Sequence, residues 1–439
     1  MTALEKGYEL LNAWRGEDYI HGCGVLPEIG TLTARYGKKV MLVSTKTYAP
    51  LTEQAIGSIR AAGGILVPET IVPGARPNAP KEDVYRIAAE ILRVHPDVVI
   101  SFGGGSTIDA VKAAIALAVL EDGEAPSAGD GKDDLSWQGG PVDRFFGTGL
   151  VTEALQSSGR KMLPHIAVET AASSGAHLTK YANITDLQGG QKMLIVDPAV
   201  VPTAALFDYD ATLSMPRSVT IDGALDGISH TLEVFWGAKP DYYEKAQEIA
   251  LTALELILGN AKKVLENPSD RAGREALGVA TDLGGYAIMV GGTSGAHLTS
   301  FSLIDVTAHG TACGIMNPYY AVFYSPAIQE QLATIGEVLK RYGFMEEDAA
   351  LLQGRARAEA VSCGMMTFAA SIGAPTKLSE LPSFREAHVA RILSAAKKPE
   401  LKMKLQNMPV PMTAEDVDPY MGPVIRAAVS GDLSVIVNK

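Results

Sequence analysis

A glycine-rich turn between a buried strand and an apolar helix constrains the fold most. The sequence DVVISFGGGSTIDAVKAAIALAV spans residues 97–119, and its β-branched run ends at Gly103, Gly104 and Gly105. Because glycine lacks a Cβ, backbone N–H groups there can approach a phosphate, and the helix N-terminus adds its dipole. Ser106 is also a good N-cap residue, so a capped helix after a tight turn is the alternative. The position at the carboxyl end of a strand favours a diphosphate site.

The first 210 residues alternate short β-branched runs with helical stretches, which indicates a parallel sheet with crossover helices. This pattern predicts a Rossmann-like α/β domain that binds a dinucleotide. Strands are expected at 39–44, 65–72, 97–102, 165–170, 181–186 and 192–196, and helices at 51–63, 79–95 and 106–121.

Beyond residue 212 the pattern changes to successive helices, among them 216–237, 241–267 and 269–290, which continue to residue 429. We therefore expect two domains, an α/β domain at 1–212 and an all-helical domain at 213–439, with a cleft between them. Residues 121–160 are rich in Gly, Asp, Ser and Pro, which predicts a surface loop or, alternatively, a lid.

Composition excludes several classes of function. The 439 residues carry 38 basic and 50 acidic side chains, a net charge of −12, so binding to nucleic acid or an anionic membrane is not expected. Three cysteines without CxxC spacing argue against a disulfide framework. The longest apolar run, AAIALAVL at 113–120, is far shorter than the roughly 20 residues of a membrane span. We expect a soluble, cytoplasmic protein.

One carboxylate and three imidazoles in the helical half are candidate metal ligands. Asp226 and His230 lie four residues apart in SVTIDGALDGISHTLEVFWG, so they project side by side from one helix, either as metal ligands or as a simple surface pair. His297 and His309 fall in a segment with almost no charge, where each is a ligand or a hydrogen-bonded core histidine. Together they form an Asp/His₃ set that suits Fe²⁺, Zn²⁺ or Mn²⁺ and leaves one position for a substrate oxygen.

Several motifs in order make the chain similar to the iron-containing (group III) alcohol dehydrogenase family. GGGSTIDAVKA resembles the family's GGGSxxDxxK, ALDGISHTLEV its DALxHxxEA helix and AHGTACGIMNP its PHGxxNAxLLP segment, while GCGVLPEIG, TKYANITD and KMLIVDPAVVPTAALFD also follow the family pattern. The family includes maleylacetate reductase and, more distantly, glycerol dehydrogenase and 3-dehydroquinate synthase. The resemblance implies an α/β nucleotide-binding domain followed by a helical metal-binding domain.

The resemblance also implies roles for individual residues. The metal ligands would be Asp226, His230, His297 and His309. The family's cofactor-contacting positions correspond here to Asn78, Gly103, Gly104, Gly105, Ser106, Asp109, Thr170, Ser174, Thr179 and Lys192. Of these, the glycine-rich turn would bind the diphosphate, the three residues at 170–179 the nicotinamide half, and Lys192 the nicotinamide ribose.

Two departures from the family pattern affect the expected chemistry. The family loop TTAGTGSEVT reads TAASSGAHLT here, so Ala176 and His177 replace a Ser–Glu pair. A further family histidine, four residues after His297, is Phe301 in this chain. The usual proton route is therefore in question, and His177 is a candidate relay, with a structural role as the alternative.

The function expected is that of a metal-dependent NAD(P)(H) alcohol dehydrogenase or aldehyde reductase, in which hydride passes between nicotinamide and a metal-bound alcohol or carbonyl. A 3-dehydroquinate synthase-like or glycerol dehydrogenase-like enzyme is the alternative, and a non-catalytic metal- and nucleotide-binding protein a third. After the first strand, Ser44, Thr45 and Lys46 lie at the turn where the adenosine ribose is expected, and NAD-preferring relatives often carry an Asp at the position of Thr45. The absence of this Asp favours NADP(H) over NAD(H). Fe²⁺ is the expected metal, a small alcohol or aldehyde the substrate, and a homodimer or higher homo-oligomer the assembly.

Overall fold

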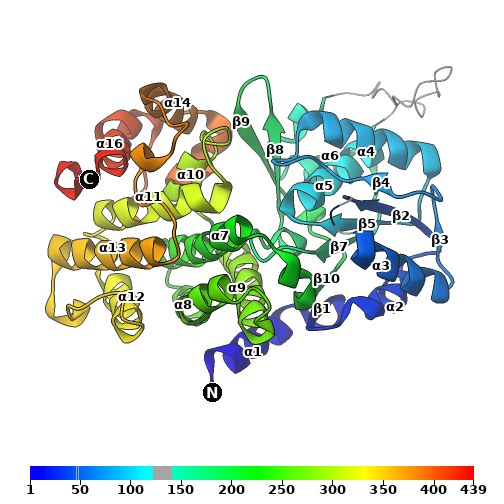
Figure 1. Cartoon of the computed structure of the whole chain (residues 1–439). Helices are drawn as coiled ribbons and strands as arrows, with labels where there is room; N and C mark the ends of the chain where they lie inside the picture. Colours follow the sequence, from blue (N-terminus) through cyan, green and yellow to red (C-terminus); the bar gives the residue numbers. More distant parts are fainter. Residues whose placement is uncertain (46, 48, 122–140) are drawn as a thin grey trace. The chain divides into compact units, whose positions relative to one another are not determined.

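The computed structural model describes residues 1–45, 47, 49–121 and 141–439. Contacts divide the chain into two compact units (Figure 1). The α/β unit comprises Arg15–Ala171 and Gly175–Thr212, and the helical unit comprises Met1–Trp14, Ala172–Ser174 and Leu213–Lys439. Three residues from a loop in the N-terminal half thus belong to the helical unit.

A seven-stranded parallel sheet forms the centre of the α/β unit. Its strand order is β1-β10-β7-β5-β2-β3, and β4 also pairs with β2. The strands are β1 (Tyr19–Gly22), β2 (Lys39–Ser44), β3 (Ile65–Leu66), β4 (Val72–Pro73), β5 (Val98–Gly103), β7 (His165–Glu169) and β10 (Ala204–Asp208). A small second sheet has the order β6-β9-β8, with β6 (Gly147–Thr148), β8 (Tyr181–Asp186) and β9 (Gln191–Val196).

Helices cover both faces of the main sheet, because its side chains alternate between two apolar cores. On β2, Val40 and Leu42 enter one core, with side chains from α2 (Ile29–Ala34) and α3 (Ala49–Ala61). Met41 and Val43 enter the opposite core, with side chains from α4 (Lys81–Val94) and α5 (Gly105–Leu120) (Figure 1). These cores explain why the strands read as continuous apolar runs.

The strand order reverses between β2 and β5. From β2 the chain passes to β3 on one side, whereas β5, β7 and β10 follow on the other side. In an open parallel sheet, ligands bind outside the carboxyl ends of the strands at such a reversal. Those ends carry Thr45 after β2 and the turn Gly103–Gly105 after β5.

The helical unit is arranged around α7 (Arg217–Trp236), which is buried along most of its length and packs against α8, α9 and α11 (Figure 1). The other helices of this unit are α1 (Ala3–Arg15, of which Arg15 is grouped with the α/β unit), α8 (Tyr243–Glu266), α9 (Arg271–Val290), α10 (Gly295–Ser300), α11 (His309–Phe323), α12 (Gln329–Arg341), α13 (Gly354–Ser371), α14 (Glu386–Ala396), α15 (Lys402–Gln406) and α16 (Gly422–Ser430). Among the described residues, no helix combines the length and the hydrophobicity that crossing a bilayer requires.

The predicted fold class is confirmed, with two local corrections. The single strand expected at 65–72 is two short strands, β3 and β4, because Pro68 has no N–H to continue a ladder. The loop expected at 121–160 contains helix α6 (Leu150–Ser158), whose Val151 is buried. The same range also contains the short strand β6. Residues 122–140 of that prediction lie outside the described residues.

Candidate functional site

Four side chains of the helical unit converge at one carboxylate oxygen. The Nε2 atom of His230, one turn along α7 from Asp226, lies 3.6 Å from Asp226 Oδ1. The Nε2 atoms of His297 on α10 and His309 at the start of α11 lie 3.8 Å from the same oxygen. Ligands at 2.1 Å from a tetrahedral metal stand about 3.4 Å apart, so these separations fit a shared divalent ion.

The close approach of α11 to α7 depends on Gly310. A Cβ at this position would lie 2.1 Å from the Asp222 carbonyl oxygen and 2.7 Å from Asp226 Cβ. Asp222 also accepts hydrogen bonds from the Thr311 N–H at 2.7 Å and the Thr311 hydroxyl at 3.0 Å. The first turn of α11, with His309, is therefore held directly on the helix that carries Asp226.

Two of the imidazoles are oriented by partners at Nδ1. His297 Nδ1 lies 2.6 Å from Glu233 Oε1, and His309 Nδ1 lies 3.0 Å from the Ser300 hydroxyl. A carboxylate at Nδ1 fixes the tautomer that leaves Nε2 for a metal and raises the basicity of that ring. Glu233 itself is buried, and although burial alone would raise its pKa, attraction to His297 and hydrogen bonds from His297 and Ser294 lower it.

The electrostatics favour neutral imidazole at His230. Burial, followed by the positive charges of His297 and Lys404, lowers the pKa of His230 well below its ordinary value. Neutral imidazole is the form that binds metals. The side chain of His309 is the most exposed of the four, at 22 %, so an incoming substrate oxygen would approach on its side.

Cys313, Lys404 and Phe301 also lie at this site. Cys313 Sγ, one turn after His309, is within 4.8 Å of the ligand atoms of Asp226, His297 and His309, and burial raises its pKa well above the usual range. Burial lowers the pKa of Lys404 to about 8. The Lys404 ammonium lies 5.7 Å from the centre of the Phe301 ring, which is stacked on His309 at 6.1 Å. An apolar ring thus stands beside the most open ligand.

In the α/β unit, the glycine-rich turn and the Asn78 turn come together. Gly104 is the N-cap of α5, and Ser106 Oγ accepts a hydrogen bond from the Asn78 N–H at 3.0 Å. Asn78 has a left-handed φ of 68°, which Asn tolerates better than most residues. The Asn78 carbonyl accepts a hydrogen bond from the Thr185 hydroxyl at 2.5 Å, so strand β8 holds this turn in place.

The two charged residues of helix α5 are buried, not exposed. Lys112 Nζ lies 3.9 Å from Asp109 Oδ1, and burial raises the pKa of Asp109 while it lowers that of Lys112 to about 8. Asp109 Oδ2 accepts from the backbone and side-chain N–H groups of Asn183 at 3.0 and 3.2 Å. Lys192 on β9 is also buried and its charge lowers the pKa of Asp109. Asp109 therefore connects the helix to the small sheet.

Thr45 lies at the carboxyl end of β2, near the first turn of α5. A Cβ on Gly74 would meet Thr45 Cγ2 at 2.8 Å and Thr107 Oγ1 at 2.9 Å, so Gly74 lies between these two side chains. The neighbouring Lys46 lies outside the described residues.

The loop after β7 holds Thr170, Ser174, His177 and Thr179. Thr170 and Thr179 are buried, and the Thr170 hydroxyl has no hydrogen-bond partner among the described residues. His177 is fully buried, with Nδ1 3.4 Å from Glu169 Oε2 and Nε2 3.2 Å from the Tyr19 hydroxyl oxygen. Within the helical unit, the Ser173 hydroxyl donates to Asp226 Oδ2 at 3.4 Å.

The structure brings together the four side chains that the sequence predicts as metal ligands. Several side chains around them were not predicted from the sequence: Asp222, Glu233, Ser300, Cys313 and Lys404. Glu233 gave one signal, since it stands three residues after His230 in an otherwise apolar helical stretch. The others had no local signal, because their partners are distant in the sequence.

Comparisons with known proteins identify the family of the chain. A sequence model described as iron-containing alcohol dehydrogenase matches residues 16–209, and one for the C-terminal part of that family matches residues 220–421. An NAD-dependent methanol dehydrogenase of Bacillus methanolicus is 26% identical over 82% of this chain and 86% of its own length. An NADPH-dependent butanol dehydrogenase of Clostridium saccharobutylicum is 25% identical over 75% and 78%.

Solved structures show the same fold. An archaeal halo-thermophilic alcohol dehydrogenase from a Red Sea brine pool superposes with a TM-score of 0.77 at 22% identity, covering 94% of this chain and 96% of that one. The family models, together with a group of side chains able to hold a metal ion (Asp226, His297, His309 and Cys313), define a dehydrogenase that uses a nicotinamide nucleotide. The chain belongs to the iron-containing alcohol dehydrogenase family and is an oxidoreductase acting on CH–OH groups.

Proposed function

We propose that this chain reduces small aldehydes, and oxidises the corresponding alcohols, with a divalent metal held by Asp226, His230, His297 and His309. The main support for this metal site is that three imidazole Nε2 atoms lie 3.6 to 3.8 Å from one oxygen of the Asp226 carboxylate. Three imidazoles and one carboxylate suit Fe²⁺, and also Zn²⁺ or Mn²⁺, and the family favours iron.

When bound, the metal polarises the substrate oxygen and the nicotinamide supplies or accepts the hydride. The chain's own residues set the geometry for this chemistry. Glu233 orients His297, and Asp222 holds the helix turn that carries His309. Phe301 stacks on His309 and has no proton to give. It therefore provides an apolar wall and excludes water beside the ligand set.

We assign the cofactor to the carboxyl edge of the parallel sheet. The residues proposed to contact it are Thr45, Asn78, Gly103, Gly104, Gly105, Ser106, Asp109, Thr170, Ser174, Thr179 and Lys192. The hydrogen bond between Asn78 and Ser106 supports a shared site for the diphosphate, and the buried link from Asp109 to Asn183 supports the placement of β8 and β9 beside it.

The variant His297→Ala tests the metal assignment. Without one imidazole the site should lose most of its metal and nearly all turnover of butanal with NADPH. The buried Glu233 carboxylate loses its His297 partner but still accepts from the Ser294 N–H, so we expect a less stable protein that keeps its fold, which circular dichroism would check. Metal content would be measured by plasma emission spectrometry. His388→Ala is the matched control, since His388 belongs to the same unit but contacts Asp305 and Arg385 instead. Unchanged metal content in His297→Ala would refute the ligand set.

We further propose a preference for NADP(H). Relatives include both NAD-dependent and NADPH-dependent enzymes. The cofactor preference is therefore inferred from the residues of this chain. A hydroxyl at Thr45 can donate to a 2′-phosphate, whereas an Asp there would repel it and accept from a 2′-hydroxyl.

Thr45→Asp should therefore lower kcat/KM with NADPH by about tenfold or more while kcat/KM with NADH changes little or rises. Thr45→Ser keeps the hydroxyl and is the matched control. Both cofactors would be compared on butanal. A higher kcat/KM with NADH than with NADPH in the wild type, or an undiminished kcat/KM with NADPH in Thr45→Asp, would show that Thr45 does not bind the 2′-phosphate.

A reducing compartment such as the cytoplasm is proposed because Cys23, Cys313 and Cys363 carry thiols in place of disulfides. Assembly as a homodimer or higher homo-oligomer stays a prediction, which sedimentation velocity would test.

A further inference from the structure

The start of the loop after β7 is held by a buried carboxylate. Glu169, the last residue of β7, is buried, and its Oε1 accepts hydrogen bonds from the N–H groups of Thr170 and Ala171, both at 3.0 Å. A carboxylate that accepts two backbone N–H groups makes strong, charge-assisted bonds. Glu169 therefore fixes the direction in which the loop leaves the sheet.

A histidine and a tyrosine continue from this carboxylate. His177 Nδ1 lies 3.4 Å from Glu169 Oε2, and His177 Nε2 lies 3.2 Å from the hydroxyl oxygen of Tyr19 on β1. The His177 ring also meets Phe207 edge-on, with ring centres 5.4 Å apart. With a proton on Nδ1, the tyrosine hydroxyl donates to Nε2, while Nδ1 faces the carboxylate at ion-pair distance without completing a hydrogen bond. Glu169, His177 and Tyr19 thus form one row of buried side chains in contact.

A buried lysine holds the far end of the same loop. Lys112 Nζ donates to the carbonyl oxygens of Ala176, Thr179 and Tyr181 at 2.7, 2.8 and 2.7 Å. All three donor positions of the ammonium are used on this segment. Buried ionic side chains thus fix both ends of residues 170–181 within the α/β unit.

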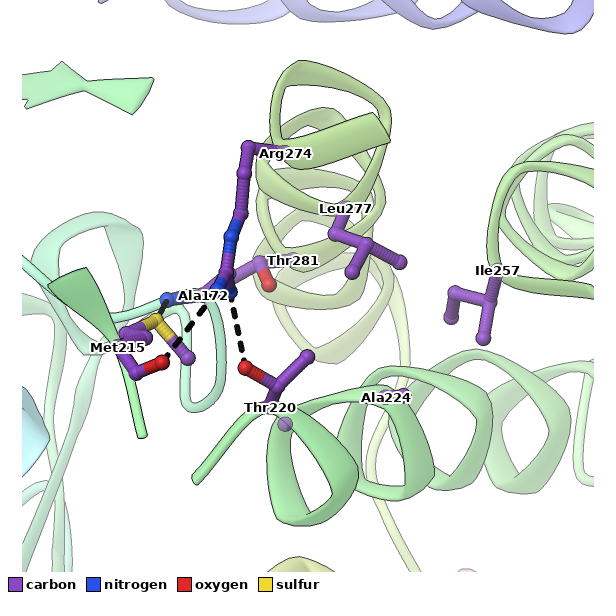
Figure 2. A pocket seen from close by; sticks show the side chains of 9 residues that line it. Ala172, Met215, Thr220, Ala224, Ile257, Arg274, Leu277 and Thr281 are labelled. Atoms are coloured by element: carbon purple, nitrogen blue, oxygen red, sulfur yellow. Dashed lines mark hydrogen bonds between the residues drawn. The ribbon is translucent and has the colours of Figure 1, made fainter. Parts of the chain in front are cut away.

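The middle of the loop, Ala172–Ser174, is grouped with the helical unit. Figure 2 shows Ala172 beside Met215 in that unit. The Ala172 N–H donates to Met215 Sδ at 3.3 Å, and a Cβ on Gly223 would lie 1.8 Å from the Ala172 carbonyl oxygen. Arg274 holds Met215 in place beside Ala172, because its guanidinium donates to the Met215 carbonyl at 3.3 Å and to Thr220 Oγ1 at 2.8 Å. Little freedom is left for the segment once its ends are fixed.

The carboxylate stands at an unusual place for the family that this chain resembles. The family loop TTAGTGSEVT carries its glutamate at the position of His177, whereas this chain carries a glutamate eight residues earlier, at 169. In this chain Glu169 places a negative charge near Lys112, whose pKa it raises. The loop is therefore held by a different pair of residues.

We propose that Glu169 and His177 are positioning residues that hold residues 170–179 in the shape that receives the nicotinamide half of the cofactor. This inference rests on the proposed function of the loop. His177 acts through Glu169 rather than as a proton relay, because its ring is fully buried between Tyr19 and Phe207 and Nε2 faces the tyrosine. Gly104, at the start of α5, supports this placement, since a Cβ there would lie 3.5 Å from Ala171 Cβ and 3.9 Å from Glu169 Oε1.

A positioning role predicts a defined kinetic effect. If the loop occupies its receiving shape for only a fraction of the time, the apparent Kd of the cofactor rises by the inverse of that fraction. The chemical step from the bound state is unchanged, so kcat should change much less than KM.

The test compares Glu169→Ala with Glu169→Gln. Alanine removes both acceptor oxygens, and we expect the Kd and KM for NADPH to rise about tenfold with kcat within about threefold of wild type. Glutamine keeps an acceptor for Thr170 and Ala171, and we expect it to restore the Kd to within about threefold. The Kd would be measured by quenching of NADPH fluorescence without substrate, and bound metal by plasma emission spectrometry, which should not change.

Ser101→Ala is the matched control, because Ser101 forms a buried hydrogen bond of 2.8 Å with His165 in the same sheet but does not contact the loop. An equal rise in Kd for Ser101→Ala would mean that any loss of buried polar contact is sufficient, and the proposal would fail. It would also fail if Glu169→Ala left the Kd unchanged, or lowered kcat with the Kd unchanged. Wild-type protein that binds NADPH but reduces no aldehyde would instead overturn the proposed function and leave the loop test intact.

Discussion

At the scale of single residues, the site depends on contacts that orient its ligands. Glu233 is the clearest case, because its carboxylate lies 2.6 Å from His297 Nδ1 and also accepts from the Ser294 N–H at 2.6 Å. Both the ring and the start of α10 are thereby fixed by one side chain of α7. A residue that never contacts the metal then controls the direction of Nε2.

Glu233→Gln tests this control. Glutamine is nearly isosteric but neutral, so His297 loses its negatively charged partner and Nε2 becomes less basic. Removing a hydrogen-bond partner of a metal-binding histidine lowers metal affinity or activity about 10- to 100-fold. We expect a loss of metal affinity in that range, measured by competition titration with a zinc-binding dye. Circular dichroism should show an unchanged fold. A metal affinity equal to wild type would mean that the ring is held by its packing alone.

Whether the sequence predicts that two residues pair depends on how far apart they lie in the chain. Asp226 and His230 were predictable as a pair because both lie on one helix face, four residues apart. The pairing of Glu233 with His297 joins residues 64 positions apart, and only the packing of α10 against α7 creates it. His177 shows the same limit, because its sequence marked a departure from the family but gave no sign of Tyr19 or Glu169 as its partners.

At the scale of elements, the metal cluster requires α11 to pack unusually close to α7. The strand and helix periodicities predicted most of the elements, including α7, α8 and α9 to within a few residues. Helix α6 was missed, although Leu150, Val151 and Leu155 have helical spacing, because the surrounding Gly-rich composition indicated a loop. Periodicity locates an element but does not give the distance between two elements, and Gly310 sets that distance here.

Gly310→Ala is expected to move the first turn of α11 away from α7. The new methyl group would lie 2.1 Å from the Asp222 carbonyl oxygen, which is backbone and cannot rotate aside. Separating His309 from Asp226 should lower the bound metal by at least about tenfold, and crowding of this kind also costs about 1–3 kcal/mol of unfolding free energy.

Gly57→Ala is the control for Gly310→Ala. Gly57 lies within helix α3, and a Cβ there meets nothing within 4 Å. Alanine in an open helical position should stabilise the protein by about 0.5–1 kcal/mol and leave the metal content unchanged. Urea unfolding and metal analysis of both variants would separate the effect of crowding from that of helix propensity. Equal metal content in Gly310→Ala and wild type would show that α11 tolerates a wider separation.

At the scale of the whole molecule, the two kinds of ligand are assigned to different compact units. All four side chains proposed as metal ligands lie in the helical unit, while nearly all the proposed cofactor contacts lie in the α/β unit. Ser174 is the exception, since Ala172–Ser174 is grouped with the helical unit. A ligand that binds only the folded form of a unit stabilises that unit by mass action. Metal and cofactor should therefore protect different parts of the chain from unfolding.

Hydrogen exchange followed by mass spectrometry would test this separation. Removing metal with a chelator should accelerate amide exchange in α7, α10 and α11 while β2, β5 and β7 change little. NADPH at 100 times its Kd stabilises the folded α/β unit by about 2.7 kcal/mol, so exchange through unfolding of that unit should slow about 100-fold. Peptides of α8 and α9 serve as an internal control for the cofactor, because they belong to the helical unit without contributing a metal ligand. Equal slowing of α8, α9 and the sheet by NADPH would show that the two units unfold as one cooperative body.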